Sequence, residues 1–189
     1  MSKGQNKQEM LNSEDTQILN MIESPELRNQ GYQLLVNKFK EKLYWHIRRI
    51  VLDHDDADDV LQNTFMKVVR KIDGFQHQSS LFTWLYRIAT NESLNFINNK
   101  KNRKTEHIED TLFFKSAGDN LMDEKVILNL LQLAINRLPE KQKLVFNMRY
   151  YDEMSYQEIS DITETSTGAL KASYHHAVKK IEEQLKAGI

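Results

Sequence analysis

Apolar residues recur along this chain three and four positions apart, which is the period of an α-helix. Between residues 58 and 72, the two halves of a helical wheel differ sharply in polarity. One half holds Val60, Leu61, Phe65, Val68, Val69 and Ile72, and the other holds Asp59, Gln62, Asn63, Met66 and Arg70. The same period continues through 32–51, 81–97, 126–138 and the C-terminal tail, and no stretch alternates as a half-buried strand does. The pattern predicts an all-α protein.

The helical period lapses between Asn98 and Asp123, where Lys-Lys-Asn-Arg-Lys precedes a stretch of mixed charge. This segment is too long for an ordinary connection within a compact bundle. We therefore predict two small helical domains joined by a flexible linker. The expected division is an N-terminal tail over 1–19, a first domain over 20–100, a linker over 101–122 and a second domain over 123–189.

The second domain carries the sequence pattern of a helix-turn-helix. Ser155 and Glu158 have the spacing of a reciprocal capping box, which starts a short helix. After a tight turn, Ser166 can cap a second helix over 167–181, which contains three lysines and no acidic residue. In a helix-turn-helix, the second helix enters the DNA major groove by its N-terminal residues. The alternative is an αα-hairpin with a solvated lysine face.

The stretch from Ser80 to Lys104 begins with aromatic residues and ends with cations. Its expected core face comprises Leu81, Leu85, Ile88, Ala89 and Phe96, and the polar stripe opposite comprises Thr83, Arg87, Thr90, Asn91 and Asn98. Phe82, Trp84 and Tyr86 fit either the core or a surface on which unstacked bases stack. Periodicity leaves both interpretations open.

Charge and composition exclude several classes of protein. The net charge of −1 over 189 residues means that any nucleic-acid contact must come from local clusters of cations. The chain has no cysteine, which excludes disulfides and thiolate metal sites and fits a reducing cytosol. No apolar run approaches the roughly 18 residues of a membrane span, and the N-terminus lacks the apolar region of a signal peptide. We expect a cytoplasmic protein without stable membrane insertion.

The sequence carries no motif for catalysis or metal binding. Residues 53–59 are rich in aspartate, but Asp58 stands where a calcium loop needs glycine, and Thr64 stands where that loop ends on glutamate. A capped helix start explains these acids better, because acids favour the positive end of the helix dipole. The histidines lack zinc-binding spacing, and no nucleophile elbow, phosphate loop or dinucleotide fingerprint occurs. We expect no enzymatic activity, no metal and no cofactor.

Four motifs, taken in order, closely resemble the extracytoplasmic-function (ECF) group of bacterial sigma factors. They are Asp-Asp-Ala-Asp-Asp-Val-Leu-Gln-Asn-Thr-Phe (55–65), Phe-Thr-Trp-Leu-Tyr-Arg-Ile-Ala-Thr-Asn (82–91), Leu-Pro-Glu-Lys-Gln-Lys-Leu-Val-Phe (138–146) and the helix-turn-helix. The likeness extends from about Tyr32 to Leu185. It implies a protein that binds core RNA polymerase and promoter DNA, directs promoter-specific transcription initiation, and has a cognate anti-sigma factor.

The resemblance also implies three sets of contact residues. The first domain would bind the clamp helices of the polymerase β′ subunit through Asp58, Asp59, Gln62 and Asn63. It would recognise and melt the minus-ten element through Phe75, Trp84, Arg87, Asn91, Lys100, Lys101, Arg103 and Lys104, with Asn91 and the loop 74–80 holding a flipped base and the late cations holding phosphates. The second domain would read the minus-thirty-five element through Ser166, Thr167, Lys171, Ser173, His175 and Lys179. The resemblance also implies that the protein contacts the β flap of the polymerase.

Several positions depart from the pattern of the family, among them Ser173 and His176, where many relatives carry arginine. Leu85 follows Trp84 where housekeeping sigma factors have a second tryptophan, which implies weaker melting and a stricter demand on promoter sequence. Glu164 stands in the turn of the helix-turn-helix, where many relatives have glycine. Because a left-handed backbone is strained at glutamate, we expect a slightly different turn.

Two other functions fit parts of the sequence. A stand-alone helix-turn-helix regulator, with an unrelated helical sensor domain, would bind duplex operators without polymerase. A protein-interaction module would use the acidic helix and the aromatic residues as an interface and leave the lysines solvated. Dependence on polymerase tests the first alternative, and any DNA-dependent activity tests the second.

Overall fold

The computed structural model describes residues 13–103 and 122–187, and for 102–103 and 122–125 it defines the backbone alone. Eight α-helices and one short 3-10 helix lie in these ranges, which contain no strand. The all-α prediction is therefore confirmed. The chain divides into two compact units: one holds α2 to α5, and the other holds α6, α7, α9 and most of α8.

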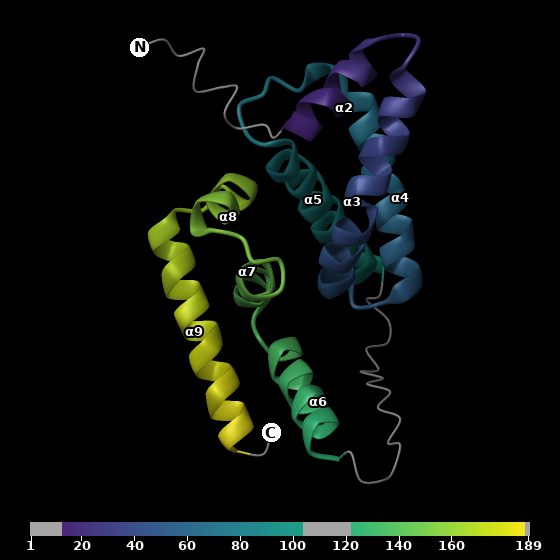
Figure 1. Ribbon diagram of the computed structural model, residues 1–189. Coiled ribbons are helices and arrows are strands. Elements are labelled where there is room, and N and C mark those ends of the chain that lie inside the picture. The colour runs from purple at the N-terminus through teal and green to yellow at the C-terminus, as the bar shows by residue number, and fades with distance from the viewer. Residues whose placement is uncertain (1–12, 104–121, 188–189) are drawn as a thin grey trace. The chain divides into compact units, whose positions relative to one another are not determined.

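The first unit is a bundle whose long helices alternate in direction (Figure 1). Its elements are α2 (Ser13–Glu23), α3 (Arg28–Val51), α4 (His54–Lys71), the 3-10 helix η1 (Ile72–Gly74) and α5 (Leu81–Arg103). The core of the three long helices comprises Leu35, Phe39, Leu43, Ile47, Ala57, Val60, Leu61, Val68, Leu81, Leu85, Ile88 and Ala89. These residues have the helical spacing seen in the sequence, so burial of one apolar face explains the bundle.

Helix α2 begins at Ser13, inside the stretch expected to be an N-terminal tail. It packs on α3 because Ile18, Leu19 and Ile22 are buried. The Lys38 ammonium of α3 also lies 2.5 Å from Glu14 and 2.9 Å from Asp15. The hydrogen bond from Lys38 lowers the pKa of Glu14. This ion pair therefore fastens the start of α2 to α3.

Gly31 allows α3 to approach α2 closely. A Cβ at this position would stand 2.7 Å from Cγ1 of Ile22 and 2.8 Å from its backbone nitrogen. We predict that Gly31→Ala lowers the free energy of unfolding by roughly 1–1.5 kcal/mol, because this overlap outweighs the higher helix propensity of alanine. Chemical denaturation measures the change. Gly168→Ala is the control, since a Cβ there meets nothing within 4 Å; equal losses in both variants would contradict the prediction.

The second unit holds α6 (Met122–Asn136), α7 (Glu140–Tyr150), α8 (Tyr156–Thr163) and α9 (Thr167–Lys186). Helix α9 packs against both α6 and α7. Their shared core comprises Ala134, Ile135, Leu138, Phe146, Ala177 and Ile181. The rings of Phe146 and Tyr174 stack with centroids 5.8 Å apart. This core fixes α9 on α7 through its apolar face and leaves the lysine-bearing face outward.

Both predicted helix caps of the second unit are confirmed. The backbone N–H of Ser155 donates to Glu158 Oε2 at 2.7 Å, and the N–H of Glu158 donates back to Ser155 Oγ at 3.2 Å. The N–H of Ala169 donates to Ser166 Oγ at 3.3 Å. Helices α8 and α9 therefore begin where the capping residues predict.

Helix α5 extends to Arg103, three residues into the expected linker, and α6 begins at Met122. The remainder of that linker, 104–121, lies outside the described residues, as do residues 1–12 of the expected tail. Within the described ranges, no helix combines the length and the apolar character needed to cross a membrane.

Candidate functional site

The aspartate-rich stretch at 53–59 is the capped start of α4, as predicted. Asp53 is the capping residue, and its carboxylate accepts a hydrogen bond from the backbone N–H of Asp56 at 3.0 Å. This bond lowers the pKa of Asp53. No group of three or more potential metal ligands occurs in the part of the chain that the structure describes.

The four residues predicted to bind polymerase lie together on the exposed side of α4. Asp58, Asp59, Gln62 and Asn63 are all exposed, and their spacing stacks them in two neighbouring rows one helical turn apart. Asp58 Oδ2 also lies 3.8 Å from His54 Nε2. The structure thus brings this predicted set together as one polar surface.

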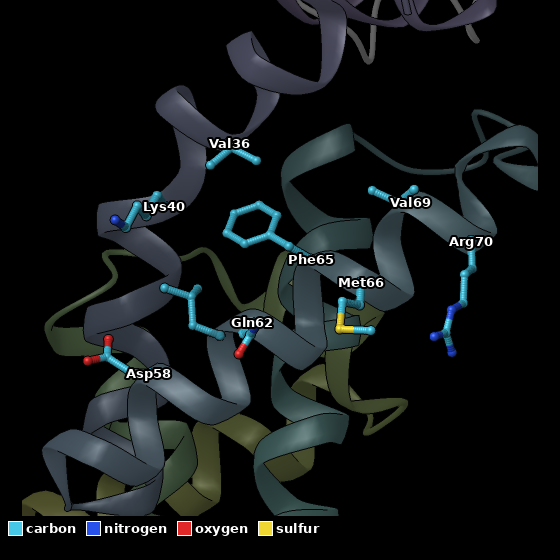
Figure 2. A pocket seen from close by; sticks show the side chains of 9 residues that line it. Val36, Lys40, Asp58, Gln62, Phe65, Met66, Val69 and Arg70 are labelled. Carbon is cyan, nitrogen blue, oxygen red and sulfur yellow. The ribbon is translucent and has the colours of Figure 1, made fainter. Parts of the chain in front are cut away.

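An open groove of about 630 Å³ lies between α3 and α4 beside this surface. Its lining comprises Val36, Lys40, Asp58, Leu61, Gln62, Phe65, Met66, Val69 and Arg70. Figure 2 shows the Phe65 ring facing Val36, with Lys40 and Asp58 near one end of the groove and Arg70 at the other. Two of the predicted polymerase contacts, Asp58 and Gln62, therefore border an apolar depression.

Only part of the apolar half of the 58–72 segment is buried in the core. Val60, Leu61 and Val68 of α4 and Ile72 of η1 are buried. Val69 is 44% exposed, however, and Phe65 is only partly buried. Met66, placed in the polar half, is 47% exposed and shares the groove with them. The sequence did contain a signal for these exposed apolar residues. The apolar half of the helix is about 180° wide, whereas a surface helix needs a stripe of little more than 100° to pack on a core.

The aromatic residues around the start of α5 divide between the core and its rim. Tyr86 is 2% exposed and is a core residue, whereas Phe82 and Trp84 are only partly buried. Phe75, from the loop before α5, is 8% exposed, and its ring centroid lies 5.1 Å from that of Trp84. The buried Phe75 ring thus packs against Trp84, and the Trp84 ring is the more accessible of the two.

A polar stripe does run along α5, although it is narrower than expected. Arg87, Asn91, Asn98 and Lys101 fall within a sector of about 80° around the helix axis. The last three are exposed, and Arg87 is partly buried. The structure therefore brings Asn91 and Lys101 onto one face, and Trp84 lies at its edge.

Two threonines predicted in this stripe are buried instead. Thr90 is 2% exposed, and its hydroxyl donates to the Tyr86 carbonyl at 2.7 Å and lies 2.9 Å from His46 Nε2 of α3. Thr83 is 3% exposed, and its Oγ1 lies 2.8 Å from Ser80 Oγ. Because these hydroxyls have hydrogen-bond partners inside the bundle, they can be buried at little cost.

Lys100 lies apart from the stripe. It follows Asn91 by nine residues, which places it about 180° around an ideal helix. Its Nζ is 2.5 Å from Oδ2 of Asp56 on α4. For Arg103 only the backbone is defined, and Lys104 lies outside the described residues. The structure thus separates Lys100 from the other predicted minus-ten contacts that it describes.

In the helix-turn-helix, most of the predicted contacts lie near one another. Ser166 caps α9 and Thr167 begins it, while Lys171, His175 and Lys179 follow at four-residue intervals on exposed positions. Ser173 is partly buried and lies about 200° around the helix from Lys171. Lys179 Nζ lies 3.9 Å from Glu183. The exposed row of α9 therefore carries Lys171, His175 and Lys179 without Ser173.

The turn between α8 and α9 is left-handed at Glu164, where φ is 54°. The expectation of a different turn is wrong, because the glutamate adopts the strained conformation that favours glycine. We predict that Glu164→Gly raises the free energy of unfolding by about 1 kcal/mol. Thermal denaturation tests this. Glu164→Ala, which removes the same side chain without relieving the strain, is the control; an equal gain would argue against backbone strain as the cause.

Two family models match this chain. Residues 35–103 match "Sigma-70 region 2", and residues 128–181 match "Sigma-70, region 4". Among curated proteins, the ECF RNA polymerase sigma factor SigW of Bacillus subtilis is 29% identical over 165 residues, covering 80% of this chain and 87% of SigW. The ECF RNA polymerase sigma-E factor of Escherichia coli is 28% identical over 168 residues, covering 83% of this chain and 87% of that protein.

Solved structures share the fold. CnrH, in complex with the cytosolic domain of CnrY, matches with a TM-score of 0.69 and 19% identity, covering 93% of this chain and 99% of CnrH. The sigma factor RpoE of Bartonella quintana, in complex with the anti-sigma factor NepR, matches with a TM-score of 0.66 and 23% identity, covering 82% of this chain and 96% of RpoE. The chain belongs to the sigma-70 family and, within it, to the ECF group of RNA polymerase sigma factors. It is a transcription initiation factor that binds core RNA polymerase and directs promoter-specific initiation.

Proposed function

We propose that the groove between α3 and α4 and the polar surface beside it are where this sigma factor binds core RNA polymerase, through the clamp helices of the β′ subunit. The groove is the observation that carries the proposal. Apolar side chains at its centre, bordered by Asp58, Gln62 and Arg70, have the anatomy of a protein interface with an apolar core and a polar rim. Phe65, Met66 and Val69 join the contact set for this reason.

The first unit also offers a surface for the minus-ten element. Asn91 and Lys101 share the exposed stripe of α5 with Arg87, and Trp84 lies at its edge. An amide can form hydrogen bonds with a base, a cation can neutralise phosphate, and an accessible ring can stack on an unpaired base. We assign minus-ten recognition to this stripe and the loop 74–80, with Phe75 supporting Trp84. We assign phosphate contacts to Arg103 and Lys104 from the resemblance alone.

The second unit offers a separate surface for duplex DNA. Ser166 and Thr167 lie at the N-terminus of α9, and Lys171, His175 and Lys179 follow along its exposed row. We assign recognition of the minus-thirty-five element to these residues, with Ser173 at the edge of the surface. We assign the contact with the β flap to the same unit, 123–189, and the polymerase clamp and minus-ten contacts to 20–100.

Regulation by a cognate anti-sigma factor is part of the same proposal. Two structural neighbours were solved in complexes, CnrH with CnrY and RpoE with the anti-sigma factor NepR. A partner covering the α3–α4 groove would block polymerase. Because the activity depends on RNA polymerase, we place the protein in the cytoplasm, acting without catalytic activity or a cofactor of its own.

Run-off transcription tests the proposed function. Purified bacterial core RNA polymerase is incubated with fragmented DNA from the source organism, with and without this protein, and transcript starts are mapped. We expect discrete new starts that share two upstream motifs, and core polymerase alone is the control. Binding to duplex DNA without polymerase, in the absence of new transcripts, would instead identify a stand-alone regulator.

A further inference from the structure

Lys100 has a different environment from the cation next to it. Lys101 shares the stripe with Asn91, whereas Lys100 points to the opposite side of α5, toward α4. There its Nζ lies 2.5 Å from Asp56 Oδ2 and 5.9 Å from the centroid of the Phe96 ring. The Lys100 side chain is 44% exposed, so it lies at the edge of the bundle with its ammonium group turned toward α4 and away from the stripe.

Asp56 is well placed to hold that lysine. Its side chain is only 18% exposed, and its backbone N–H donates to Asp53, the cap of α4. The carboxylate is thus fixed in the first turn of the helix, two residues before Asp58. Because the carboxylate is largely shielded from water, its attraction to Lys100 is screened less than in an ion pair on an open surface.

A second ion pair joins the same two helices. Lys67 of α4 pairs with Glu92 of α5, whose side chain is 21% exposed. The two pairs lie at separate levels along α4, near residues 56 and 67. Two separated attachments fix the orientation of one helix against another better than one. Of the two, only the pair at Asp56 lies at the start of α4, beside the polar surface.

We propose that Asp56 and Lys100 form a clasp that sets the start of α4 for polymerase binding, so that Lys100 is a positioning residue and not a phosphate contact. The clasp joins the helix that carries Asp58 and Asp59 to the helix that carries Asn91. The inference rests on the proposed function of α4. It assigns the two adjacent lysines to different tasks: Lys100 orients the polymerase surface, and Lys101 meets DNA.

A double-mutant cycle tests the clasp in the full-length protein. The variants are Asp56→Asn, Lys100→Met and the double variant, and affinity for core RNA polymerase is measured for each. We expect each single variant to bind about tenfold more weakly and the double variant to lose little more, because both changes remove one interaction. Lys100→Arg should bind nearly as the unaltered protein does. An additive, roughly hundredfold loss in the double variant would overturn the proposal.

The salt dependence of promoter binding by the holoenzyme separates the clasp from a phosphate contact. We expect Lys100→Met to leave the salt slope unchanged and Lys101→Met, the contrasting variant, to reduce it by about one unit. A reduced slope in Lys100→Met with unchanged polymerase affinity would overturn the proposal. So would a variant whose melting temperature falls while its polymerase affinity stays unchanged.

The Gln62→Lys variant separates failure of the clasp from failure of the function proposed for α4. If Gln62→Lys binds polymerase normally, the function proposed for α4 fails. If Gln62→Lys loses affinity but the Asp56 and Lys100 variants do not, only the clasp fails.

Discussion

Core RNA polymerase is expected to bind the Met66→Asp variant about 100-fold more weakly than the unaltered protein. Met66 is 47% exposed in the α3–α4 groove, so the substitution leaves the core of the bundle untouched. It places a carboxylate where an apolar partner surface would exclude water, at a cost of about 3 kcal/mol. Equilibrium binding of labelled sigma factor to core polymerase measures the change.

Leu34→Asp is the matched control for this experiment. Leu34 is 43% exposed on α3 and is not among the residues that line the groove. The same change of chemistry at a similar exposure should therefore leave polymerase affinity unaltered. If both variants bind polymerase as well as the unaltered protein does, the groove is not the interface. If both bind equally poorly, the added negative charge weakens binding wherever it is placed, and the groove has no special role.

Promoter opening is expected to fall about 30-fold in the Asn91→Ala variant at its cognate promoter. Asn91 is exposed on the stripe of α5, and loss of its hydrogen bonds to one base would cost about 2 kcal/mol. The loss should also relax discrimination at a single minus-ten position. Opening rates on promoters substituted at each minus-ten position, measured with holoenzyme, reveal which position that is.

Asn99→Ala is the matched control for the loss of an asparagine. Asn99 is exposed on the same helix, about 80° around the axis from Asn91. It should open the cognate promoter at the normal rate. A uniform loss on every promoter in the Asn91→Ala variant would show that Asn91 contacts the backbone of DNA and does not read a base.

The two interfaces proposed for the first unit lie on different helices joined by the same core. The proposed polymerase groove lies between α3 and α4, and the stripe proposed for minus-ten DNA lies on α5. His46 of α3 pairs with Thr90 of α5, and Asp56 of α4 pairs with Lys100 of α5. These contacts between helices help to fix the orientation of the α3–α4 groove relative to the α5 stripe.

Much of the fold could be predicted because its signals are local. The caps at Ser155 and Ser166 are fixed by side chains within three residues of the backbone groups they bind. The helices follow from the period of apolar residues, and one buried face per helix is enough to predict a bundle. The resemblance to sigma factors rested on motif order, which the sequence alone displays.

The sequence by itself determined the all-α fold, the capped starts of α4, α8 and α9, and the family, but not α2, which begins inside the expected N-terminal tail. Tertiary structure decided which members of an apolar or cationic set face the core, a groove or solvent. Phe65 and Val69 line a groove because α3 covers only part of the apolar half of α4, and Met66 of the polar half lies beside them. Lys100 faces Asp56 because α4 lies along that side of α5. Helical periodicity gives the directions of side chains around one axis, but the neighbour that each direction meets is set by packing between helices distant in the sequence.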